Sequence, residues 1–205
     1  MAVVLGTPAF VASDEAPAER ELSLVFGGGG AFGIAWHLAV IAALRDAGFD
    51  VDRAPAVGTS AGSWACAALR LDLPIEAFAS VHAIKVPDFR PGMLRDVARE
   101  IFGDAEVPDA QISAVGIPRL RHRMFRADQH PVAELVAASS AVPGVFAPQN
   151  IEGRPHIDGG VRSVDGANFA PRAQLLVASI PLGGPLMGPL GRVLEASTRL
   201  ALKRW

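Results

Sequence analysis

The stretch FGGGGAFGIAW, residues 26–36, places four consecutive glycines between a short apolar run and a longer one. Glycine loses more backbone entropy on folding than any other residue, so a run of it needs a compensating reason. The preceding ELSLVF (21–26) is typical of a buried strand, and residues 31–50 carry apolar side chains at helical spacing. We therefore predict a strand-to-helix loop whose main chain is closely approached by another group.

One interpretation of this loop is nucleotide binding. Gly28, Gly30 and Gly33 fit the G-x-G-x-x-G pattern of a dinucleotide-binding loop between a strand and a helix. Asp50 and Asp52 follow at about the spacing, roughly 20 residues, at which such domains place the acid that binds a ribose. The pattern is short and these glycines are consecutive, so it stays one hypothesis among others.

A second glycine motif, GTSAG (58–62), favours nucleophilic catalysis. It has the form G-x-S-x-G, with a short predicted strand over 54–60 before it and an alanine- and leucine-rich helix over 61–71 after it. In this context the turn holds the central serine, here Ser60, in strained backbone angles, and Gly58 and Gly62 let strand and helix pass closely. The simpler alternative is a tight turn in which Ser60 caps the helix.

A serine nucleophile needs a base, and the sequence offers two. The order Ser60, Asp104, His156 would satisfy the chain order of an α/β-hydrolase triad. That fold places several strands before the nucleophile, however, and here only one strand and one helix precede it. The other base is Asp158, in HIDGG (156–160), which can take a proton directly from a serine within hydrogen-bond reach.

The glycines around these groups have roles in this interpretation. Gly159 and Gly160 would let the chain turn sharply and leave the Asp158 carboxylate exposed, although an ordinary Asp-Gly turn is the simpler explanation. The amides of Gly28, Gly29 and Gly30, beside a helix N-terminus, would form an oxyanion hole for an ester attacked by Ser60.

At these motifs the sequence resembles the patatin-like phospholipase family. The glycine loop (28–33), the elbow (58–62) and the Asp-Gly-Gly (158–160) occur in the family's order, and residues 138–163 are similar to the stretch that precedes its catalytic aspartate. The resemblance extends from about Leu22 to Ile180.

The resemblance implies a three-layer α/β/α fold with a mostly parallel central sheet. It also implies a Ser60–Asp158 dyad that hydrolyses acyl esters of lipids, as a phospholipase A, lysophospholipase or esterase, without a metal or another cofactor. Gly28, Gly29 and Gly30 would form the oxyanion hole by carry-over from the family's loop.

Two departures from the family pattern support an alternative hypothesis. Phe32 stands where the family usually has Arg or Lys before the last glycine of the loop, Gly33, and the stretch between Ser60 and Asp158 is short. A catalytically impaired module that binds a lipid or a protein therefore stays open.

The remaining chain is predicted to complete one α/β domain over 22–205, after a loosely ordered leader over 1–21. The other predicted elements are a short helix over 74–81, helices over 91–103, 131–142 and 191–205, and strands over 111–117, 122–128, 154–158 and 173–180.

Net charge, cysteine count and the length of apolar runs exclude several classes of binding partner. The net charge is −2 and no basic stripe stands out, so we expect no nucleic-acid partner. The single cysteine, Cys66, excludes an internal disulfide and a CxxC metal site. No run approaches about 20 apolar residues, and the first residues lack a basic region typical of a signal peptide, which indicates a cytoplasmic protein. Peripheral membrane contact is compatible with a lipid substrate: RLRHR (119–123) would attract anionic headgroups or simply be a solvated strand end.

Overall fold

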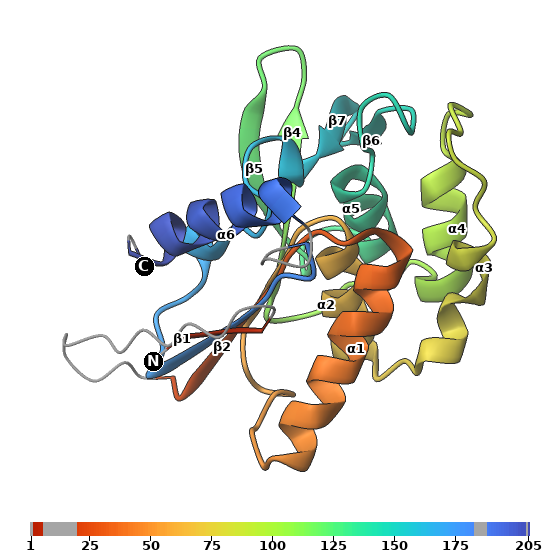
Figure 1. The fold of residues 1–205 in the computed structure, drawn as a ribbon. Coiled ribbons are helices and arrows are strands. Elements are labelled where there is room, and N and C mark those ends of the chain that lie inside the picture. Colours follow the sequence, from red (N-terminus) through yellow and green to blue (C-terminus); the bar gives the residue numbers. More distant parts are fainter. Residues whose placement is uncertain (1, 6–19, 183–187, 204) are drawn as a thin grey trace.

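The computed structural model describes residues 2–5, 20–182, 188–203 and 205, which form an α/β fold (Figure 1). Within these residues the chain forms one eight-stranded sheet in the order β1-β8-β2-β3-β4-β7-β6, with β5 paired to the other side of β4. The strands are β1 (Ala2–Leu5), β2 (Leu22–Phe26), β3 (Ala56–Gly58), β4 (Ala110–Gly116), β5 (Arg121–Arg126), β6 (Gln149–Ile151), β7 (Arg154–Asp158) and β8 (Leu175–Ser179).

Strands β1, β8, β2, β3 and β4 are all parallel to their neighbours in that order, whereas β5, β6 and β7 pair antiparallel. Phe26, Gly58 and Ile112 are level with one another across β2, β3 and β4. Because the carboxyl ends of parallel strands meet at one edge of a sheet, the glycine loop and the GTSAG turn lie at the same edge. We call this the carboxyl edge.

Helices cover both faces of the sheet, which gives three layers (Figure 1). The larger core packs the sheet residues Leu24, Phe26 and Ile112 against α1, α2, α4 and α5, and the smaller core packs Val25, Val57 and other residues near α6. The helices are α1 (Gly30–Asp46), α2 (Ala61–Leu71), α3 (Ala79–His82), α4 (Met93–Phe102), α5 (Val132–Ser139) and α6 (Gly188–Leu202), with 3₁₀ turns η1 (Ile75–Phe78), η2 (Gly159–Val161) and η3 (Ala167–Phe169).

The predicted α/β class and mostly parallel sheet are confirmed, and the helix predicted over 61–71 has the bounds of α2. Two strands went unpredicted. Ala2–Leu5, within the expected leader, forms β1 beside β8; residues 6–19 of that segment lie outside the described residues. Gln149–Ile151 forms β6, which is too short to give a periodic signal. Among the described residues, no helix combines the length and the hydropathy needed to cross a membrane.

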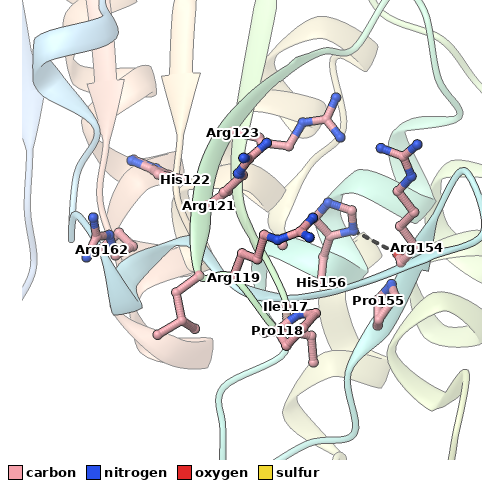
Figure 2. Close-up of a pocket in the computed structure, with 12 residues that line it drawn as sticks. Ile117, Pro118, Arg119, Arg121, His122, Arg123, Arg154, Pro155, His156 and Arg162 are labelled. Atoms are coloured by element: carbon pink, nitrogen blue, oxygen red, sulfur yellow. Dashed lines mark hydrogen bonds between the residues drawn. The ribbon is translucent and has the colours of Figure 1, made fainter.

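The hairpin of β4 and β5 extends past the parallel strands β2 and β3 at the carboxyl edge, and β7 runs beside it. A pocket of about 790 Å³ lies at its tip (Figure 2). We call it the arginine pocket. Its lining residues are Gly116, Ile117, Pro118, Arg119, Leu120, Arg121, His122, Arg123, Arg154, Pro155, His156 and Arg162.

Candidate active site

Ser60 lies in a strained turn between β3 and α2. Its φ of 52° is on the left-handed side, which is uncommon for a residue other than glycine and costs about 1–3 kcal/mol. Ser60 occupies the N-cap position of α2, yet its side chain makes no capping hydrogen bond. The capping-serine interpretation is therefore wrong, and the hydroxyl is available for another partner.

The elbow depends on close contact between strand and helix. A Cβ atom at Gly62 would lie 1.9 Å from the carbonyl oxygen of Phe26, and one at Gly58 would lie 2.5 Å from that of Gly62. A Cβ atom at Gly33 of α1 would lie 3.0 Å from the Cβ of Ala61. These three glycines allow the close packing of β2, β3, α1 and α2 that brings the glycine loop next to Ser60.

The structure brings Asp158 to Ser60, although they come from different elements. Asp158 ends β7 opposite Ala114, and the Ser60 side chain lies near enough to its carboxyl to lower the pKa of that group. The Asp158 residue is 4% exposed. Burial raises the pKa of this carboxyl from 3.8 to about 6, against the lowering effect of the nearby Ser60 side chain and of the hydrogen bond from the Gly160 N–H. The pair thus combines a hydroxyl with a carboxylate whose proton affinity lies near neutral pH.

The two glycines after Asp158 have different structural duties. The Gly160 N–H donates to Oδ1 of Asp158 at 2.6 Å, so the Asp-Gly turn exists and also fixes the carboxylate. A Cβ atom at Gly159 would lie 1.9 Å from Oγ of Ser113 on β4. The same Ser113 hydroxyl is hydrogen-bonded to Oγ1 of Thr59, beside Ser60, at 2.8 Å. Ser113 therefore contacts the residue before Ser60 and the residue after Asp158.

The glycine loop differs in one respect from the predicted oxyanion hole. The Gly28 N–H donates to the carbonyl oxygen of Val164 at 3.0 Å, so it is not available as an oxyanion donor in this conformation. The N–H groups of Gly29 and Gly30 have no backbone acceptor among the described residues. They precede the first intrahelical bond of α1, from the Gly33 N–H to the Gly29 carbonyl. The oxyanion prediction is thus restricted to Gly29 and Gly30.

His37, on α1, is hydrogen-bonded to the main chain at the start of the glycine loop. Burial lowers the pKa of this histidine from 6.5 to about 4, so the ring is neutral near pH 7. Its Nε2–H donates to the carbonyl oxygen of Gly27 at 2.8 Å, and Nδ1 then accepts from the Ser179 hydroxyl at 2.9 Å. These bonds connect α1, the loop and β8, which fixes the loop's main chain.

Residues 139–141, at the end of α5, join the elbow to the acid. Oγ of Ser139 accepts from the Ser60 N–H at 2.9 Å, and the Ala141 carbonyl accepts from the Asp158 N–H at 3.0 Å. Oγ of Ser140 accepts from Nε1–H of Trp64 at 2.8 Å. Sequence reasoning gave these serines no role; two adjacent serines at the end of an apolar helix were the only signal.

An apolar pocket of about 370 Å³ opens beside Ser60. Its volume is in the usual range for ligand pockets, about 300–1,000 Å³. Phe32 does not line it; that side chain is 66% exposed and lies against Trp36. The lining residues are Gly30, Ala31, Ile34, Ser60, Ala61, Trp64, Val81, His82, Ile84, Val86, Leu94, Ser140, Val142, Val145 and Phe146.

The histidine triad is wrong. Asp104 is exposed and pairs with Arg99 at 3.0 Å. His156 donates from Nδ1 to the carbonyl oxygen of Arg154 and packs against Phe125. Neither group is a partner of Ser60.

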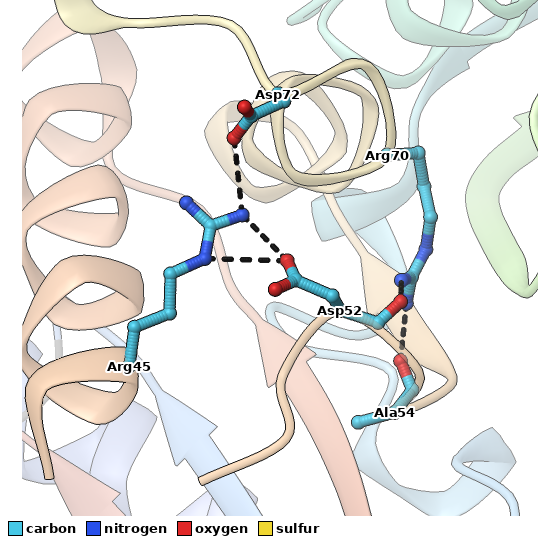
Figure 3. Close-up of polar contacts among 5 residues, drawn as sticks. All are labelled: Arg45, Asp52, Ala54, Arg70 and Asp72. Atoms are coloured by element: carbon cyan, nitrogen blue, oxygen red, sulfur yellow. Dashed lines mark hydrogen bonds and ion pairs between the residues drawn. The ribbon is translucent and has the colours of Figure 1, made fainter. Parts of the chain in front are cut away.

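The nucleotide interpretation fails on topology. Asp50 and Asp52 precede β3 and so lie at the amino edge of the sheet, opposite the glycine loop. Asp52 pairs with Arg45, near the far end of α1, at 2.5 Å (Figure 3). Arg70 donates to the main-chain carbonyls of Asp52 and Ala54. The acid that should bind a ribose is therefore part of a surface ion-pair network. Among the described residues, no group of three His, Cys, Asp or Glu side chains is placed to hold a metal ion.

A strained serine elbow next to a buried aspartate, beside a glycine loop and an apolar pocket, is an arrangement typical of serine acyl hydrolases. Comparisons with known proteins find similarity to one family. Residues 89–170 match the family model described as Patatin-like phospholipase, a range that includes Asp158 but not Ser60. Two mycobacterial proteins, the uncharacterized NTE family proteins Rv1063c of Mycobacterium tuberculosis and Mb1092c of Mycobacterium bovis, are each 29% identical to this chain over 189 residues.

The fold comparison agrees. The crystal structure of VipD from Legionella pneumophila aligns with 83% of this chain at a TM-score of 0.52 and 13% sequence identity. Together these comparisons support a patatin-like family member, which confirms the resemblance drawn from the sequence. The chain spans about half the length of these proteins, 51% of the mycobacterial relatives and 52% of VipD, and the match to the relatives covers 82% of this chain.

Proposed function

We propose that this chain is a carboxylic ester hydrolase that cleaves acyl esters of lipids through a Ser60–Asp158 dyad. The observation that carries the proposal is a strained serine, Ser60, that lies beside the buried carboxyl of Asp158 and lines an apolar pocket. The similarity to the patatin-like family supports lipid acyl hydrolase activity in general. The test is whether substitution of either residue abolishes labelling by a fluorophosphonate probe and hydrolysis of a p-nitrophenyl ester.

In the acylation step, Oγ of Ser60 attacks the ester carbonyl carbon and its proton passes to the Asp158 carboxylate. The carbonyl oxygen becomes an oxyanion, which the Gly29 and Gly30 amides would stabilise by about 3–4 kcal/mol for each donor. When the tetrahedral intermediate collapses, the bond to the alcohol breaks and Asp158 returns the proton to the departing oxygen. The acyl group is then bound to Ser60.

Deacylation repeats the sequence with water. A water molecule gives a proton to Asp158 and attacks the acyl carbonyl carbon. When this intermediate collapses, the bond from the acyl carbon to Oγ of Ser60 breaks, Asp158 returns the proton to Oγ, and the fatty acid leaves. The apolar pocket, which includes Ile34, Trp64 and Leu94, would bind the acyl chain. The polar part of the substrate would then remain toward solvent.

The pKa of Asp158 predicts the pH dependence of activity. The base must be ionised before it can accept a proton, so protonation at low pH removes the active form. With a pKa of about 6, kcat/KM for p-nitrophenyl butyrate should be level above about pH 7 and fall roughly tenfold per pH unit below 6. His37, with a pKa of about 4, does not titrate in this range. His82→Gln removes the imidazole that lines the pocket and should leave this fall in kcat/KM at low pH unchanged. If the fall disappeared in His82→Gln, it could not be assigned to Asp158.

The pocket assignment predicts a change in chain-length preference. Ala31→Trp places a large ring in the pocket lining, so kcat/KM for p-nitrophenyl decanoate should fall at least about tenfold while the acetate is cleaved nearly as well. Ala39→Trp, on an exposed position of the same helix, is the matched control and should change either rate by no more than about twofold. Equal losses on both esters in Ala31→Trp would place the acyl chain elsewhere.

A further inference from the structure

The arginine pocket collects positive charge close to the catalytic aspartate. Five of its lining residues are arginines, and none of its lining residues is acidic. Figure 2 shows Arg119, Arg123 and Arg154 around His156, with His122 and Arg162 on the other side of the hairpin strand. The pocket therefore combines side chains from the β4–β5 hairpin, from β7 and from the segment that follows Asp158.

In the part of the chain that the structure describes, no carboxylate forms an ion pair with the guanidinium groups of the five pocket arginines. The field acts on the two histidines: burial lowers their pKa values, and Arg123 and Arg154 lower that of His156 further, as Arg162 lowers that of His122. Glu152, the acid that opposes this effect at His156, lies 3.9 Å from His130. An unpaired cluster of exposed arginines is suited to bind phosphate groups.

Apolar side chains project among these charges. Leu120, in the hairpin turn between Arg119 and Arg121, is 45% exposed, and Val161, next to Arg162, is 46% exposed. An exposed apolar side chain between arginines suits the boundary between lipid headgroups and acyl chains, whereas a small soluble anion or a nucleic acid backbone gains nothing from it.

The position of the hairpin relates it to Ser60. Ile112 is level with Gly58, and β4 continues four residues further to Gly116. At about 3.3 Å per residue, the hairpin turn stands roughly 13 Å beyond the elbow on the same carboxyl edge. A planar surface that contacts the turn therefore faces the edge at which the apolar pocket opens.

We propose that the arginine pocket and Leu120 form a docking surface for anionic phospholipid membranes. Arginines at the pocket bind lipid phosphates, and Leu120 enters the headgroup region. Docking does not require Ser60 or Asp158, so the surface is separate from the hydrolase proposal and can be tested without catalysis.

The test measures co-sedimentation with vesicles of phosphatidylcholine alone and of phosphatidylcholine with phosphatidylglycerol. Ser60→Ala protein is used so that the lipid stays intact. It should bind the anionic vesicles, more weakly as salt rises. Adding R119Q/R154Q should weaken binding roughly thirtyfold, at about fivefold per arginine. Leu120→Asn, which keeps the left-handed backbone at this position (φ 49°) acceptable, should also weaken it.

A matched pair of substitutions removes the same charge at the opposite edge. R20Q/R53Q changes exposed arginines that precede β2 and β3, and should leave vesicle binding unchanged. When Ser60 is kept, the R119Q/R154Q protein should hydrolyse soluble p-nitrophenyl butyrate as fast as the unsubstituted chain does. If neither the unsubstituted chain nor the R119Q/R154Q protein hydrolyses this ester, the result counts against the hydrolase proposal and not against docking.

Three results would overturn the docking proposal. One is absence of binding to anionic vesicles, and another is equal loss in the R119Q/R154Q and R20Q/R53Q proteins. The third is selective binding of another anion at the pocket: a thermal shift with inorganic phosphate, or binding of duplex DNA, that R119Q/R154Q removes while vesicles are not bound. Vesicle binding lost only in R119Q/R154Q and reduced in Leu120→Asn supports it.

Discussion

Ser60→Ala is expected to abolish labelling by a fluorophosphonate probe and to lower kcat for p-nitrophenyl butyrate by about 10⁴–10⁶-fold. The reason is that the substitution removes the nucleophile while leaving the pocket and the loop amides in place. The Ser60 hydroxyl makes no capping bond to α2, so its loss should alter the melting temperature little. The measurement is gel-based labelling beside steady-state hydrolysis of purified protein.

Asp158→Asn separates the base from the shape of the site. Asparagine keeps an oxygen that can accept from the Gly160 N–H, but it cannot take the proton of Ser60. We expect labelling to collapse and kcat to fall about 10⁴-fold, as when a triad acid is replaced by its amide. Asp104→Asn is the matched control: this exposed carboxylate belongs to the excluded triad and should be dispensable.

The outcomes distinguish the two functions left open by the sequence. If the native chain neither labels nor turns over any acyl ester, the hydrolase proposal fails and the impaired lipid- or protein-binding module takes its place. If Asp158→Asn retains full labelling, another base activates Ser60. The exposed position of Phe32, outside the pocket lining, indicates that the missing basic residue at this place does not disturb the assembly of the dyad.

Local motifs were enough to predict the elbow and to select Asp158 as the candidate acid, because each motif consists of residues adjacent in sequence. The parallel sheet was predicted from the alternation of strands with helices along the chain. GTSAG predicts a strand-turn-helix by its own sterics, and the structure forms it with Ser60 at a φ of 52°. The proximity of Ser60 and Asp158, by contrast, came only from the family resemblance. Nothing in the composition of either motif specifies that β7 pairs with β4 at Ala114.

What sequence reasoning missed are contacts made across the fold by residues outside any motif. Val164 takes the Gly28 N–H and so changes which amides are free. Ser139 holds the elbow through a hydrogen bond to Ser60, which lies 79 positions earlier in the chain. His37 holds the glycine loop through hydrogen bonds to Gly27 and to Ser179, which lies 142 positions later. A serine or histidine on a helix has many explanations, and only the packed structure selects one. The arginine pocket likewise depends on the pairing of both β5 and β7 with β4, which brings residues 119–123 and 154–162 to one pocket.

Gly62→Ala should strongly destabilise the protein, because this glycine makes the close contact that shapes the elbow. The new Cβ atom would lie 1.9 Å from the Phe26 carbonyl oxygen and 2.8 Å from the Phe26 Cβ, both on or beside the central strand β2. Neither atom belongs to the flexible end of a side chain, so helix α2 must move away from β2. We expect the free energy of unfolding to fall by more than about 4 kcal/mol, which is exceptional for a single methyl group.

The same movement should impair catalysis in whatever protein remains folded. Phe26 directly precedes the glycine loop, and α2 carries Ser60 at its start, so separating them widens the gap between nucleophile and oxyanion donors. Gly48→Ala is the matched control: it has a φ of 84° but meets no atom within 4 Å, and should cost only about 1–2 kcal/mol. Thermal melts and ester hydrolysis of both proteins are the measurement. Equal stability losses with normal activity in Gly62→Ala would show that the elbow tolerates a side chain there, and the packing argument for a serine held against the loop amides would fail.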